Sequence, residues 1–110
     1  MNIREKILIV EDEKSIAHFI STILNSNDYE TLLARSGSEA KTMISSHCPD
    51  LVILDLGLPD MDGLELIQEV RSTSTLPIIV ISARTLERSK VAALDLGADD
   101  YLTKPFGTAE

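Results

Sequence analysis

Three short runs of the chain are wholly apolar: Ile7–Val10, Leu51–Leu54 and Ile78–Ile81. Each run is rich in β-branched residues and is bounded by polar residues. Continuous apolarity over four residues indicates strands that are covered on both faces, as in a parallel sheet. Two further segments, Glu30–Ala34 and Asp99–Thr103, mix apolar and polar residues, which suits the edges of a sheet. The pattern therefore predicts three central strands and two edge strands.

Helical patterns fill the stretches between these strands. The first has apolar residues at the i, i+3, i+4, i+7, i+8 spacing of one helix face, namely Ile16, Phe19, Ile20, Ile23 and Leu24. Later helices are signalled by capping and stop residues: Ser36 with Glu39, Asp62 with Glu65, and Thr85 with Gly97. Four helices are thus predicted, each between two strands.

The alternating order of strands and helices predicts an α/β fold with an open parallel sheet and right-handed crossovers. With the two mixed strands at its edges, the sheet fits the doubly wound, flavodoxin-like order 2-1-3-4-5. The length of 110 residues suits one domain, covering 1–110. The residues from Pro105 to Glu110 are too few for a fifth helix. Such a sheet would leave one flank of the last strand and its neighbours uncovered. We therefore expect a domain truncated before its closing helix, with no output domain in this chain, or else a partner that covers this flank.

Composition excludes several classes of protein. The single Cys48 cannot form an internal disulfide, which favours a reducing, cytoplasmic compartment. No apolar run approaches the ~20 residues of a membrane span, and the start of the chain lacks a signal-peptide pattern. With 10 basic and 18 acidic residues the net charge is -8, and aromatic residues make up 4%. This segment is therefore not expected to bind nucleic acid or a membrane directly.

Polar residues fall where four of the predicted strands end. Glu11 and Asp12 follow the first strand, Asp55 ends the third, Ser82 ends the fourth and Lys104 follows the fifth. In open α/β sheets, ligands bind outside the carboxyl ends of the strands. The fold alone would therefore gather three carboxylates, a hydroxyl and an ammonium group at one rim.

Three clustered carboxylates repel one another unless a cation lies between them. Oxygen ligands select a hard cation, and Mg²⁺ is the one expected in a cell. Mg²⁺ together with Lys104 would balance the three negative charges and suit an incoming phosphoryl group, to which Ser82 could donate a hydrogen bond. Asp55 is the expected nucleophile because it lies on a central strand with a partly apolar loop behind it.

Four motifs carry a specific resemblance. They read ILIVEDE at 7–13, DLGLPDMDG at 55–63, SAR at 82–84 and GADDYLTKPF at 97–106. Together they resemble the receiver domain of two-component response regulators over nearly the whole chain. The Glu-Asp pair and the GADDY-x-x-KPF ending resemble the OmpR/PhoB-type branch with winged-helix outputs. The residues of these motifs are most similar to those of the potassium-responsive Kdp regulators.

The resemblance implies a set of roles at the rim. Asp55 would accept a phosphoryl group from a phosphohistidine of a sensor histidine kinase. Asp12, Asp55 and the backbone carbonyl of Gly57 would bind Mg²⁺, with Glu11 helping directly or through water. The module would catalyse its own phosphotransfer and a slow hydrolysis, so it is not expected to be a conventional enzyme.

The resemblance also implies a switch. Lys104 would pair with the phosphoryl group, aimed by a cis peptide before Pro105. Ser82 and the adjoining Ala83 would turn toward the phosphoryl group and pull the following loop. Tyr101, which by itself suggests a half-buried packing residue, would then swing inward.

The same branch forms active dimers through its fourth helix, fifth strand and fifth helix. Lys90, Asp99 and Asp100 match charged positions of that face. Their expected partners on a fifth helix are absent from this chain. The resemblance implies a homodimer through the face made by the fourth helix and the fifth strand, whereas the missing ion-pair partners argue against dimerisation by this fragment alone.

Other interpretations stay open at this point. A Mg²⁺-dependent aspartyl-phosphate phosphohydrolase would be expected to show a D-x-D pattern, whereas positions 11 and 13 are both Glu. A phosphate-independent, receiver-like binding module would not need the complete set of acidic, hydroxyl and lysine residues. A flavodoxin-like carrier would need a phosphate-binding loop after the first strand, and none is present.

Several residues have simpler interpretations. Asp60 and Asp62 are expected to cap a helix or a turn. His18 and His47 have no paired ligands in the sequence, and both are interpreted as structural. Cys48 is interpreted as a small packing residue.

Overall fold

The computed structural model describes residues 4–83 and 87–103. Five parallel strands form one sheet in the order β2-β1-β3-β4-β5. The strands are β1 (Lys6–Val10), β2 (Glu30–Ala34), β3 (Leu51–Asp55), β4 (Ile78–Ser82) and β5 (Asp100–Thr103). The helices are α1 (Lys14–Ser26), α2 (Gly37–His47), α3 (Gly63–Arg71) and α4 (Glu87–Asp95). The predicted fold class, element order and edge strands are confirmed.

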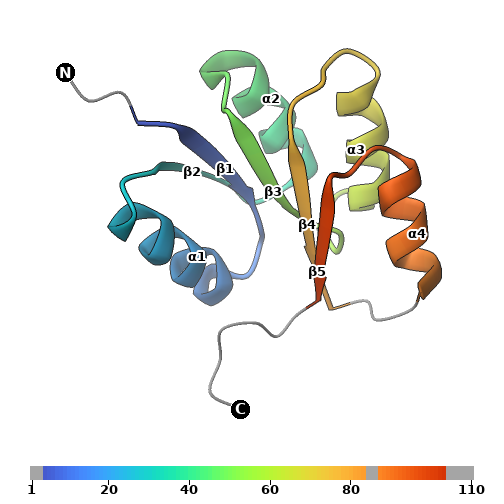
Figure 1. The fold of residues 1–110 in the computed structure, drawn as a ribbon, viewed down its shortest axis with the longest axis horizontal. Helices are drawn as coiled ribbons and strands as arrows, with labels where there is room; N and C mark the ends of the chain where they lie inside the picture. The colour runs from blue at the N-terminus through green and yellow to red at the C-terminus, as the bar shows by residue number, and fades with distance from the viewer. Residues whose placement is uncertain (1–3, 84–86, 104–110) are drawn as a thin grey trace.

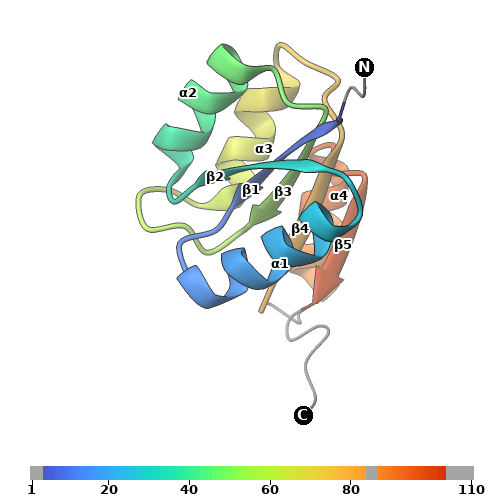
Figure 2. The ribbon, with the colours of Figure 1, turned by 90° about the vertical axis from the view of Figure 1, so that its left-hand side faces the viewer.

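The helices divide between the two faces of the sheet (Figures 1 and 2). Helices α2, α3 and α4 pack side by side on one face, and α1 packs on the other, mainly against β1 and β2. Because successive side chains of a strand point to opposite faces, each central strand contributes to two apolar cores. Leu8 and Val10 belong to the larger core, whereas Ile9 belongs with Ile20 to the smaller one beneath α1.

Two predicted helix starts are confirmed by their caps. The Ser36 hydroxyl accepts a hydrogen bond from the Glu39 N–H at 3.1 Å, and the Asp62 carboxylate accepts one from the Leu64 N–H at 3.0 Å. The Glu39 carboxylate reaches back to the N–H of Arg35, at 2.8 Å, so it satisfies the residue before the cap. These contacts fix where α2 and α3 begin. The predicted cap at Thr85 lies outside the described residues.

The prediction that Cys48 packs inside the protein is wrong. Its side chain is exposed, and its backbone has a left-handed conformation with φ 48°. The Cys48 N–H bonds to the Ile44 carbonyl at 3.2 Å, which closes the last turn of α2. The buried Pro49 follows and cannot continue the helix. The sequence signal for this position was therefore the helix end, not the apolar character of the thiol.

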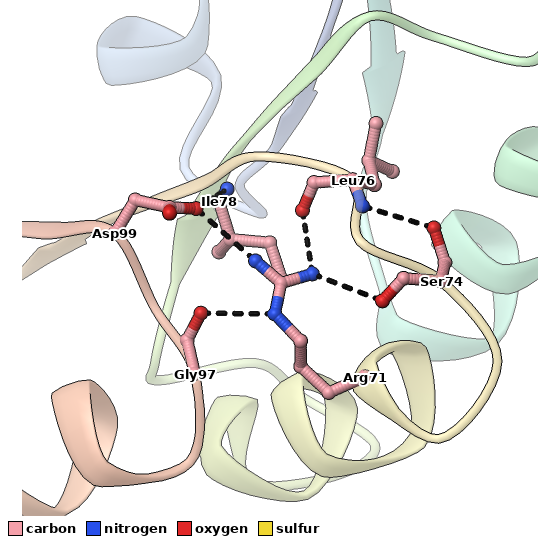
Figure 3. Close-up of polar contacts among 6 residues, drawn as sticks. All are labelled: Arg71, Ser74, Leu76, Ile78, Gly97 and Asp99. Carbon is pink, nitrogen blue, oxygen red and sulfur yellow. Dashed lines mark hydrogen bonds and ion pairs between the residues drawn. The ribbon is translucent and has the colours of Figure 1, made fainter.

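A polar cluster centred on Arg71 joins the end of α3 to the loops at the amino ends of β4 and β5 (Figure 3). Arg71 is partly buried, with its side chain 20% exposed. Its guanidinium donates to the carbonyls of Gly97 at 2.9 Å, Leu76 at 2.6 Å and Ser74 at 3.4 Å, and to Asp99 Oδ2 at 3.1 Å. The cluster thereby holds the turn after α4 against α3.

The sheet face that carries α1 is only partly covered by the described part of the chain. A groove of about 440 Å³ lies beside β1, β3 and β4 on this face, and its lining includes Ile7, Leu24, Ile53 and Ile79. Leu102 on β5 is 47% exposed. Within the described residues, the four helices leave this groove and Leu102 open. None of them is both long and apolar enough to cross a membrane.

Candidate functional site

Three carboxylates meet at the carboxyl edge of the sheet. The pairing of Val10 with Leu54 brings the residues that follow them, Glu11 and Asp55, to the same level. One carboxylate oxygen from each of Glu11, Asp12 and Asp55 lies within 4.8 Å of the others. The fold therefore gathers the three predicted acidic residues as expected.

The carboxylates differ in their exposure. Glu11 is 3% exposed and Asp55 is 5% exposed, whereas Asp12 is exposed to solvent. A cluster of three negative charges that is open on one side suits a hard divalent cation that keeps some of its water. The donor set therefore fits Mg²⁺, which carboxylates bind in preference to soft metals.

The loop after Asp55 is tightly folded. The Gly57 N–H donates to the Asp55 carboxylate at 3.3 Å, and Gly57 pairs with Asp62 in an isolated antiparallel bridge. At the base of the loop, the Gly63 N–H bonds to the Leu56 carbonyl at 2.8 Å. A Cβ atom on Gly63 would lie only 2.6 Å from Leu56 Cα, so this close approach requires glycine. The loop thus holds Gly57 directly beside Asp55.

Comparison with known proteins decides the family. The family model of the response regulator receiver domain matches residues 7–110. The chain belongs to this family. A receiver domain is a signalling module and not a conventional enzyme, in agreement with the predicted resemblance.

Individual relatives agree with this assignment. The chain is 49% identical over 104 residues to the KDP operon transcriptional regulatory protein KdpE of Escherichia coli K12, which confirms the resemblance to Kdp-type regulators. The match covers 94% of the chain and 46% of KdpE, so the chain spans about half the length of this curated relative.

Two solved structures share the receiver fold. The BeF3-activated receiver domain of Klebsiella pneumoniae RstA has a TM-score of 0.90 and 30% identity, covering 96% of this chain and 90% of that one. The Mn²⁺-bound form of the response regulator Rcp1 has a TM-score of 0.85 and 28% identity, covering 93% and 82%.

Of the predicted switch residues, Ser82 and Ala83 lie at the same edge of the sheet as the acidic cluster. Ser82 is buried at the end of β4, one residue beyond Ile81, which pairs with Asp55. The adjoining Ala83 is exposed. Tyr101 is 8% exposed and packs within the larger core, so the expectation of a half-buried side chain is corrected to a buried one. Lys104 and Pro105 lie outside the described residues.

The charged residues of the predicted dimer face differ in their contacts within the domain. Lys90 is exposed on α4. The Asp99 carboxylate accepts hydrogen bonds from Arg71 at 3.1 Å and from the Ile78 N–H at 2.8 Å. The Asp100 carboxylate accepts from the Tyr101 N–H at 2.8 Å. Asp99 thus has a structural role inside the receiver domain, and dimerisation through this face stays a prediction.

Sequence reasoning missed the partner of Asp60. Asp60 was expected to cap a helix or a turn, and it caps a helix: its two carboxylate oxygens accept the N–H groups of Gly37 at 2.8 Å and Ser38 at 3.0 Å. Those donors form the start of α2, and Gly37 is 23 residues earlier in the chain. The two hydrogen bonds lower the pKa of Asp60 from its ordinary value. No local spacing could have signalled this contact.

Proposed function

We propose that the chain is a phosphorylation-activated receiver domain in which Asp55 accepts a phosphoryl group from a sensor histidine kinase. The observation that carries this proposal is the cluster of Glu11, Asp12 and Asp55, whose oxygens lie within 4.8 Å of one another at the sheet edge. The cluster agrees with the family assignment and with the Mn²⁺-bound state of the related Rcp1.

Each residue of the cluster then has a distinct task. A carboxylate oxygen of Asp55 forms the new P–O bond as the P–N bond to the donor histidine breaks. Asp12, Asp55 and the Gly57 carbonyl would hold Mg²⁺, with Glu11 helping directly or through water. The bound ion supplies positive charge against the phosphoryl oxygens. The tight loop after Asp55 keeps the Gly57 backbone next to the acceptor carboxylate.

The switch would begin at the end of β4. The Ser82 hydroxyl would donate a hydrogen bond to the phosphoryl group, and Ala83 would move with Ser82. Lys104, oriented by the peptide bond to Pro105, would pair with the same phosphoryl group. A phosphoryl group adds about two negative charges and three acceptors, which is enough to bias a loop between two states. Tyr101 then adjusts against α4, so that phosphorylation alters the surface formed by α4 and β5.

The relatives support a proposal for the wider role. KdpE is a transcriptional regulatory protein, and its greater length leaves room for a further domain. We propose that this chain works in the cytoplasm as the 1–110 receiver part of such a regulator. Phosphorylation would control a homodimer through α4 and β5, and DNA would be bound by a domain outside this segment.

The decisive test is the replacement of Asp55. With Mg²⁺ and acetyl phosphate, the wild-type chain should gain the mass of one phosphoryl group, and with Mg²⁺ and beryllofluoride it should form a stable complex. Asp55→Asn should do neither, because an amide cannot act as the nucleophile. Intact-mass spectrometry and NMR titration give the two readouts.

Asp50→Asn is the matched control. Asp50 precedes the opposite end of the same strand, where its carboxylate accepts the Lys6 N–H at 2.8 Å. This variant should be modified like the wild type. Equal phosphorylation of Asp55→Asn and the wild type would show that Asp55 is not the acceptor. Repeated turnover of small phosphoesters by the wild type would instead indicate a phosphohydrolase.

A further inference from the structure

The loop between β3 and α3 is fixed at two separate places. At its base, Gly57 pairs with Asp62, and the Gly63 N–H bonds to Leu56. At its tip, Asp60 accepts both the Gly37 and Ser38 N–H groups. The base contacts lie within the loop itself, whereas the tip contact depends on another element of the fold.

Side-chain packing strengthens the tip contact. Gly37 is buried, and a Cβ atom there would collide with the side chain of Met61 and approach Asp60 Oδ1. Met61 and Leu58 also pack against the larger core. The tip of the loop is therefore seated on the first turn of α2 by both apolar contact and two hydrogen bonds.

The position of this contact matters because of the strand order. Helix α2 follows β2, and the loop follows β3, while β1 lies between these strands in the sheet. The contact of Asp60 with α2 therefore bridges the carboxyl end of β1, from which Glu11 and Asp12 project. It joins the segments on either side of β1 at the edge of the sheet where the acidic cluster lies.

We propose that Asp60 is a positioning residue for the cation site, acting through the loop that presents the Gly57 carbonyl. This proposal rests on the proposed function, in which that carbonyl is a ligand of Mg²⁺. A carbonyl ligand contributes affinity only when its loop is held in place before the ion arrives. Groups that hydrogen-bond directly to a metal ligand commonly change the metal affinity by about 10–100-fold when replaced, and because Asp60 acts one step further out, through the loop, we expect an effect at the lower end of that range.

The simpler explanation is that Asp60 only stabilises α2. A variant at Ser36 can distinguish this explanation from the proposal, because the Ser36 hydroxyl caps the same helix by accepting the Glu39 N–H at 3.1 Å. Asp60 and Ser36 thus both satisfy donors of one helix terminus, but only Asp60 belongs to the loop. Ser36→Ala is therefore a matched control for the loss of a cap.

The experiment measures Mg²⁺ affinity by NMR titration with the metal alone, for the wild type, Asp60→Ala, Asp60→Asn and Ser36→Ala. We expect Asp60→Ala to bind Mg²⁺ about 10-fold more weakly. Asp60→Asn keeps one acceptor oxygen and should lie between this variant and the wild type. Ser36→Ala should bind Mg²⁺ like the wild type even though its α2 is less stable.

A second readout is the rate at which acetyl phosphate modifies Asp55 as Mg²⁺ is increased. For Asp60→Ala, the half-saturating Mg²⁺ concentration should rise about 10-fold while the maximal rate stays close to that of the wild type. A merely structural loss would not separate these two quantities.

Equal Mg²⁺ affinities for Asp60→Ala and Ser36→Ala would overturn the proposal and leave Asp60 as a helix cap. A wild-type chain that binds Mg²⁺ but takes up neither beryllofluoride nor a phosphoryl group would contradict the proposed function alone. The Mg²⁺ affinities of the variants would still decide the role of Asp60 in that case.

Discussion

At the scale of single residues, the two glycines around the acceptor have different constraints. Gly63 lies against backbone: an added Cβ would be 2.6 Å from Leu56 Cα and 2.9 Å from the Asp55 carbonyl oxygen. At Gly57 the nearest atom would be Asp55 Oδ2, at 4.0 Å, which is ordinary contact. The motif DLGLPDMDG therefore needs glycine at its last position, Gly63, because a side chain has no space there. At Gly57 there is space for a Cβ atom.

This difference gives a paired prediction. Gly63→Ala should lower the free energy of unfolding by about 1–3 kcal/mol, because backbone atoms must shift to admit the methyl group. Gly57→Ala should change the free energy of unfolding much less. Urea denaturation of both variants measures the difference, and equal values would show that the loop base yields without cost.

At the scale of elements, the Arg71 cluster connects α3 to the turn that ends α4. Gly97 in that turn has φ 115°, a conformation that favours glycine, and its carbonyl accepts the Arg71 Nε–H. The end of α4 is thereby held at the amino ends of β4 and β5, far along the strands from the acidic cluster. A change at the cluster would reach α4 through the other end of this helix.

Replacing the guanidinium tests this connection. Arg71→Met should cost about 2–3 kcal/mol, because several partly buried acceptors lose a charged donor. Lys41→Met is the matched control, since the Lys41–Glu69 ion pair has side chains 42% and 48% exposed and should contribute only about 0–1 kcal/mol. Chemical denaturation of both variants measures these costs. Similar losses would mean that the Arg71 acceptors are satisfied by water.

At the scale of the whole molecule, the two faces of the sheet are covered unequally. Helices α2, α3 and α4 cover one face, while α1 leaves the groove beside β1, β3 and β4 open on the other. Exposed apolar surface of this kind contributes nothing to stability until something packs on it. The described fold is therefore expected to fall short of the stability that this sheet can reach.

The corresponding prediction concerns a longer chain. Adding an amphipathic helix after Glu110 should raise the melting temperature by about 4–8 °C for each kcal/mol gained from burial. Calorimetry of the two chains measures this rise. A helix of the same length with a polar residue at each apolar position is the control. No difference between the two extended chains would mean that the open flank is already covered in another way.

Much of this fold could be predicted from neighbours along the chain. Four-residue apolar runs mark the central strands because helices pack on both faces of the sheet. The Ser36 and Asp62 caps act over three and two residues. The acidic cluster was also predictable in outline. Parallel strands bring their carboxyl ends to one edge, so residues at 11, 12 and 55 had to be near one another once the sheet order was known.

Only the tertiary structure decided the contacts between distant segments. Asp60 caps a helix that begins 23 residues earlier, and Arg71 reaches Asp99 over 28 residues. Tyr101 is buried because the larger core extends beneath β5, which its own neighbours do not reveal. Periodicity and local caps arise from interactions between residues that are close in the sequence, so the sequence reveals them. Contacts between distant segments depend on which elements lie side by side in the fold, and the packing of the whole domain decides that arrangement.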